Sequence, residues 1–84
     1  MLVLLDDIKI RDRDTFMSYI SNTFKGNEIT TFDDLRAVLR SMTEEVEFII
    51  SDYDTIEDKS FAEIVVAELN GMSAVRENIK VTMM

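Results

Sequence analysis

The stretch VEFIISDYDTIEDKSFAEIV, residues 46–65, decides the fold because it contains a predicted strand, a loop and the start of a helix. Residues 46–50 are β-branched or aromatic except for Glu47, which predicts a buried strand. Ser60 and Glu63 have the spacing of a capping box, so we expect a helix to begin at Ser60. The apolar face of this helix is predicted to contain Phe61, Ile64, Val65, Leu69 and Met72.

Two further stretches predict strands. Residues 2–5, LVLL, are apolar throughout, which is typical of a strand buried in a parallel sheet. Residues 8–10, IKI, alternate and either extend this strand or follow it after a turn at Asp6 and Asp7. The alternation in residues 78–83 predicts a third strand at the end of the sequence.

Two helices are predicted between the first two strands. The first has Phe16, Ile20 and Phe24 on one face, and Asp12 or Asp14 supplies its N-terminal cap. Lys25, Gly26 and Asn27 end it, with a cation in the last turn and a glycine that tolerates positive φ. The second helix is TFDDLRAVLRSM, residues 31–42.

This second helix combines an apolar face with an acidic first turn. Thr31 and Asp34 have the spacing of a weak variant of the capping box, and Asp33 adds a second acid beside the electropositive helix start. The apolar face is predicted to contain Phe32, Leu35, Val38, Leu39 and Met42. The element order is therefore β-α-α-β-α-β, which predicts an α/β domain over residues 1–84 with parallel strands joined by right-handed crossovers.

The composition restricts the function. There are 17 acidic and 9 basic residues, which give a net charge of −8. This charge would repel nucleic acid and anionic membranes and would attract a basic protein, although acidic surfaces also simply keep proteins in solution. The chain has no His and no Cys, so the usual general base, thiol nucleophile and zinc ligands are missing. We therefore expect no enzyme activity, no cofactor and no metal site.

The sequence also carries expectations about location and assembly. No apolar run approaches the roughly 20 residues that a membrane span needs, and residues 1–5 lack the features of a signal peptide. The absence of cysteine fits a reducing compartment. We expect a cytoplasmic protein, and a monomer is favoured.

Three segments together resemble the barstar family of ribonuclease inhibitors. They are LVLLDDIKIRDRDTF (residues 2–16), TFDDLRAVL (residues 31–39) and VEFIISDYDTI (residues 46–56), followed by ENIKVTM at the end of the chain. The resemblance covers nearly the whole chain and implies a three-stranded parallel sheet packed by three to four helices. It also implies a function, which is to block a small basic ribonuclease with acidic side chains that occupy the places of RNA phosphates.

The resemblance identifies candidate partner-binding residues in the second helix and the loop before it. Asp33 matches the first acidic position of the inhibitory helix. Arg36 replaces an aromatic residue of the family, and Ala37 stands where the family has its most important aspartate. The loop is shorter and lacks the family's Tyr-Tyr-Gly segment. The candidate surface comprises Glu28, Thr30, Asp33, Asp34, Arg36 and Ala37, with Asp33 as the anchor.

Two alternatives to an inhibitor or immunity protein remain open. The first is an interaction module that keeps the fold and has lost the inhibitory site, as Ala37 and the short loop allow. The second is an enzyme that uses carboxylates, for which we would expect a buried carboxylate with a shifted pKa in a cleft. The acidic loop of residues 52–58 lies where α/β sheets place ligands, but it lacks the glycine and distal Glu of a calcium-binding EF-hand.

Overall fold

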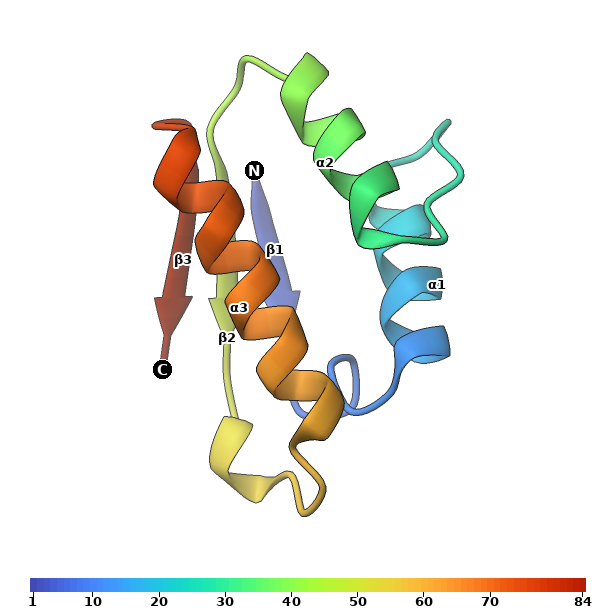
Figure 1. Cartoon of the computed structure of the whole chain (residues 1–84), viewed down its shortest axis with the longest axis vertical. Coiled ribbons are helices and arrows are strands. Elements are labelled where there is room, and N and C mark those ends of the chain that lie inside the picture. Colours follow the sequence, from blue (N-terminus) through green and yellow to red (C-terminus); the bar gives the residue numbers. More distant parts are fainter.

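The computed structural model describes all 84 residues and is shown in Figure 1. The elements follow the predicted order, with one short 3₁₀ helix in addition. They are β1 (Leu2–Leu5), α1 (Arg13–Thr23), α2 (Phe32–Ser41), β2 (Val46–Ile50), the 3₁₀ helix η1 (Tyr53–Thr55), α3 (Ser60–Val75) and β3 (Ile79–Met83). No helix is both long enough and apolar enough to cross a membrane.

The three strands form one parallel sheet in the order β1-β2-β3. Val3 pairs with Phe48, which in turn pairs with Val81. The predicted α/β fold with three parallel strands is therefore confirmed, and residues 46–50 form its central strand. Residues 8–10 do not extend β1, because the chain turns after Leu5 and the Ile10 N–H donates to the Asp6 carbonyl oxygen at 3.3 Å.

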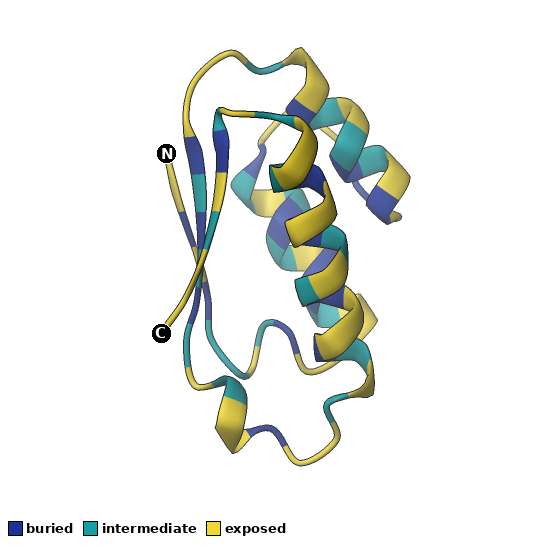
Figure 2. Ribbon diagram, turned by 60° about the vertical axis from the view of Figure 1, so that its left-hand side comes forward, coloured by how far each residue is buried: buried dark blue, intermediate teal, exposed yellow.

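All three α-helices lie on one side of the sheet (Figure 2). We call the side under the helices the covered face and the other side the open face. In β1, Val3 and Leu5 point to the covered face and are buried, whereas Leu2 and Leu4 are 62% and 54% exposed. The expectation that LVLL is a buried strand is therefore wrong for half of its residues, because no helix packs on the open face.

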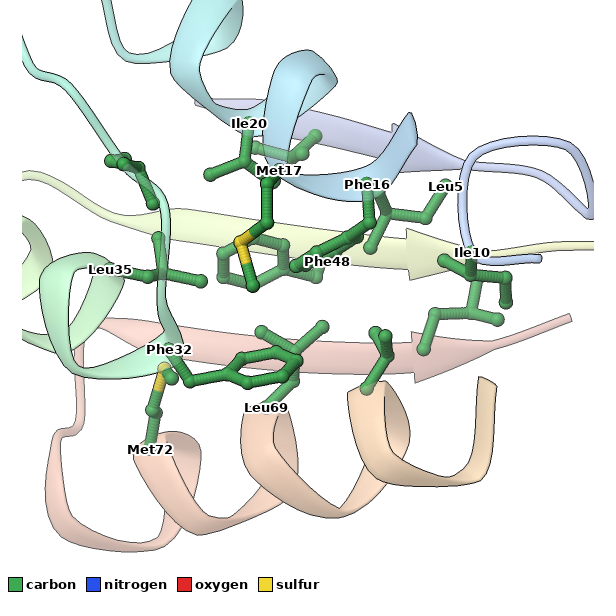
Figure 3. Close-up of a cluster of buried hydrophobic side chains, with 14 of the residues drawn as sticks. Leu5, Ile10, Phe16, Met17, Ile20, Phe32, Leu35, Phe48, Leu69 and Met72 are labelled. Atoms are coloured by element: carbon green, nitrogen blue, oxygen red, sulfur yellow. The ribbon is translucent and has the colours of Figure 1, made fainter. Parts of the chain in front are cut away.

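The core lies between the covered face and the helices, and Figure 3 shows part of it. All 20 buried residues are apolar, and no polar or charged residue is buried. An aromatic cluster joins the helices to one another, since the ring of Phe16 in α1 lies 5.6 Å from that of Phe32 in α2 and 5.9 Å from that of Phe61 in α3. This cluster fixes where α2 lies relative to α3.

The predicted N-terminal caps are found in two cases out of three, although α3 does begin at Ser60 as expected. Asp12 caps α1, because its Oδ1 accepts a hydrogen bond from the Thr15 N–H at 2.9 Å. Thr31 and Asp34 form the complete capping box of α2. The capping box predicted for α3 is wrong, because Ser60 is already the first helical residue and its N–H donates instead to the carboxylate of Asp58 at 3.0 Å.

The buried face of α3 also differs in part from the prediction. Val65, Leu69 and Met72 are buried as expected, but Ile64 is 49% exposed and Ala62 is fully buried in its place. The buried residues 62, 65, 69 and 72 are three or four positions apart and so form one stripe along the helix. Ile64 lies about 100° around the axis from Val65 and falls outside this stripe.

Candidate functional site

The six candidate residues lie together on the loop before α2 and on the first part of that helix (Figure 1). We call this the α2 N-terminal surface, formed by Glu28, Thr30, Asp33, Asp34, Arg36 and Ala37. None of the six is buried. The surface combines three carboxylates with one guanidinium.

The loop is held in place by one buried side chain and a reciprocal pair of hydrogen bonds. Ile29 is inserted into the core and is 1% exposed. Its N–H donates to Oγ of Ser21 in α1 at 3.0 Å, and the Ser21 hydroxyl donates to the Ile29 carbonyl oxygen at 2.8 Å. Because Ile29 points inward, its neighbours Glu28 and Thr30 are both exposed.

The Asp34 carboxylate is committed to the helix start. Its Oδ2 accepts hydrogen bonds from the Thr30 N–H and hydroxyl, both at 3.0 Å, and from the Thr31 N–H at 3.2 Å. The hydrogen bond from the Thr30 backbone, followed by that from the Thr30 hydroxyl, lowers the pKa of Asp34 below its ordinary value of 3.8. Asp34 therefore serves mainly the local structure, as its first-turn position predicted.

The Asp33 carboxylate is exposed and takes no part in the helix cap. Its side chain is 90% exposed, and its Oδ1 accepts a hydrogen bond from Arg36 Nη1 at 2.5 Å. Arg36 Nη2 also forms an ion pair with the Glu68 carboxylate in α3. Arg36 thus links α2 to α3 and holds Asp33 in one orientation, a role that the sequence does not reveal because Glu68 lies 32 residues away.

Ala37 lies one helical turn after Asp33 and is exposed. An acidic side chain at this position would extend the acidic surface along α2, so the alanine shortens that surface. The exposed carboxylates that remain for a partner are Asp33 and Glu28.

A second concentration of acidic residues lies beyond the carboxyl ends of β1 and β2. Asp6 and Asp7 follow β1, and Asp52 and Asp54 follow β2. Asp52 adopts φ 58°, a left-handed conformation that Asp tolerates better than most residues. Lys9 and Arg11 pair with Asp6 and Asp7 respectively, so the charge of this end is partly neutralised.

These groups can supply charge and hydrogen bonds to a partner. No set of three or more carboxylates is arranged to hold a metal ion. Three carboxylates, those of Asp12, Asp34 and Asp58, have a lowered pKa, and hydrogen bonds from nearby Thr or Ser residues are the main cause in each case. Each of the three lies at the start of a helix.

Comparison of the chain with protein-family models, with curated proteins and with solved structures finds no match to any of them. The function is therefore argued from the surface itself.

Proposed function

We propose that the protein is a barstar-like inhibitor or immunity protein that binds a small basic ribonuclease and blocks its active site with acidic side chains. The observation that carries this proposal is Asp33, a carboxylate with 90% of its side chain exposed at the start of α2. The net charge of −8 would steer a basic partner toward the chain. The sheet topology and the element order agree with the fold that the barstar resemblance implies.

The mechanism follows from the chain of contacts Asp33–Arg36–Glu68. An active site that binds RNA presents cationic groups to phosphate, and Asp33 offers them an anionic oxygen in the same way. Arg36 holds the carboxylate in place before binding, so less side-chain entropy is lost in the complex. Arg36 also rejects partners that present a cation directly at its own position, which gives selectivity.

The test is a titration of a small basic ribonuclease, of the type that barstar inhibits, with wild-type protein and with Asp33→Ala. Loss of one charge-assisted hydrogen bond should weaken binding by about tenfold to a hundredfold. Asp54→Ala is the matched control, because it removes the same charge from an exposed site in η1. Raising the salt concentration should weaken wild-type binding.

The proposal fails if the wild-type protein neither binds nor inhibits the ribonuclease at low salt. The α2 N-terminal surface is the wrong surface if Asp54→Ala abolishes binding and Asp33→Ala leaves it unchanged.

A second candidate function is an interaction module that keeps this fold without inhibiting a nuclease. Two observations favour it, since the Asp34 carboxylate is occupied by the helix cap and Ala37 contributes no charge. Such a module would bind its partner through apolar contacts, and its affinity should respond little to salt. Salt dependence therefore separates the two candidates.

A further inference from the structure

A groove of about 420 Å³ runs between the C-terminal halves of α2 and α3. Figure 1 shows that the two helices end at the same end of the molecule. Its apolar lining consists of Leu39, Ala67, Met72 and Val75, of which Ala67 and Val75 are exposed. The volume lies within the range of sites that hold small organic molecules.

Three guanidinium groups line this groove, those of Arg36, Arg40 and Arg76, against a single carboxylate, that of Glu68. Glu68 is paired with Arg36. Arg40 and Arg76 have no carboxylate within ion-pair distance, although the chain has 17 acidic residues. The groove is therefore a cationic site with an apolar lining in an acidic protein.

Helix-end electrostatics explain part of this arrangement. Arg40 is in the last turn of α2, where a cation is favourable, and Arg76 Nη2 donates to the Met42 carbonyl oxygen at 3.2 Å just after that helix. A guanidinium has five N–H donors, so the hydrogen bonds from Arg76 to Met42 and Asn78 leave donors free for a ligand.

Gly71 is the residue that helix-end electrostatics do not explain. It lies inside α3, where glycine destabilises a helix relative to alanine, and it does not have positive φ. A Cβ at this position would meet no atom within 4 Å, so packing does not require glycine either. Gly71 lines the groove, and the absence of a side chain there keeps the groove open.

We propose that the groove between α2 and α3 binds a small organic anion, with a carboxylate head held by Arg40 and Arg76 and an apolar body lying over Ala67, Gly71 and Val75. Charge complementarity selects the head, because planar guanidiniums bind carboxylates with two parallel hydrogen bonds. The apolar lining selects the body. The groove shares Arg36 with the α2 N-terminal surface, but the arginines proposed to hold the ligand are Arg40 and Arg76. The proposal does not depend on the proposed inhibition of a ribonuclease.

The probe is decanoate, an alkyl carboxylate, titrated into the full chain below its micelle concentration and followed by calorimetry and by amide chemical shifts. We expect saturable binding of one decanoate per chain, with shifts centred on residues 36–42 and 67–76. Decan-1-ol has the same apolar body without the charge, and it should bind at least tenfold more weakly.

Two variants test the apolar part and the cationic part of the groove separately. Gly71→Leu fills the groove and should abolish decanoate binding, while its melting temperature should be equal to or higher than that of the wild type because leucine favours the helix. The double variant Arg40→Gln/Arg76→Gln keeps the groove and should weaken binding at least tenfold. Arg11→Gln, which removes a cation outside the groove, is the matched control and should bind as the wild type does.

Three results would overturn the proposal. They are the absence of saturable binding to the wild type, undiminished binding to a folded Gly71→Leu variant, and equal affinity for decanoate and decan-1-ol. The last result would show that the groove is only an apolar surface and that its arginines serve the helix ends.

Discussion

The covered and open faces of the sheet are built from the same strands, yet they differ in how far their side chains are buried. On the covered face, Val3, Leu5, Phe48 and Ile50 are at most 1% exposed. On the open face, Leu4 pairs with Ile49, and Ile49 pairs with Thr82. Parallel sheets are usually covered on both faces, whereas here the helices cover only one, so the core lies on that side of the sheet alone.

The largest effect is expected when two neighbouring leucines of β1 are compared, one from each face. Leu5 is fully buried and Leu4 is 54% exposed. Leu5→Ala should reduce the free energy of unfolding by about 2–5 kcal/mol, because it leaves a cavity between the sheet and the helices. Leu4→Ala removes the same atoms and should cost no more than about 1 kcal/mol, since much of the side chain is already in water. Urea denaturation of both variants measures the two values.

Equal losses for Leu4→Ala and Leu5→Ala would contradict the one-sided core. They would mean that the open face is covered in solution.

The second test concerns the helix starts. All three carboxylates with a lowered pKa lie at the starts of the helices that pack on the covered face, and none lies on the open face. The pKa of Asp34 is lower in the folded state than its ordinary value of 3.8, so the folded state binds fewer protons than the unfolded state in this range. Its contribution to stability is therefore present above about pH 4 and is lost as the pH falls through the lowered pKa.

The measurement is the difference in urea midpoint between the wild type and Asp34→Asn at pH 7 and at pH 2. Asparagine cannot supply the charged acceptor, so the wild type should be more stable at pH 7, and the difference should shrink at pH 2. Asp33→Asn is the matched control, because it leaves the capping hydrogen bonds of Asp34 in place. A difference between the wild type and Asp34→Asn that does not change with pH would contradict this role of the cap.

Much of the fold could be predicted from the sequence because its signals are local. Three of these signals involve residues no more than about five positions apart in the chain. They are the alternation of residues 78–83, the helical spacing of Phe16 and Ile20, and the capping box at Thr31. The apolar run LVLL was misleading, because period-two burial cannot be seen where both faces of a strand carry leucine or valine. Burial there depends on where distant helices pack.

The candidate surface was predicted less completely, for the same reason. Its place at the start of α2 follows from the local pattern and from the resemblance, and the acidic residues do lie together there. The ion pair between Arg36 and Glu68 joins two helices that only the folded chain brings together. The α2–α3 groove likewise depends on the placement of two helices. Its only signal in the sequence is Gly71, a glycine that the pattern alone would place near the end of the third helix.

The smallest effect is expected for a charge placed on the open face. Three strands about 4.8 Å apart and four or five residues long form a patch on the order of 200 Å², well below the roughly 800 Å² per partner of a stable interface. Two chains that each carry a charge of −8 also repel one another. We therefore expect a monomer, and Leu4→Lys should leave the sedimentation coefficient of the protein unchanged. If the wild type sediments as a dimer and Leu4→Lys as a monomer, a second copy covers the open face, and the contrast between the two faces belongs only to the isolated chain.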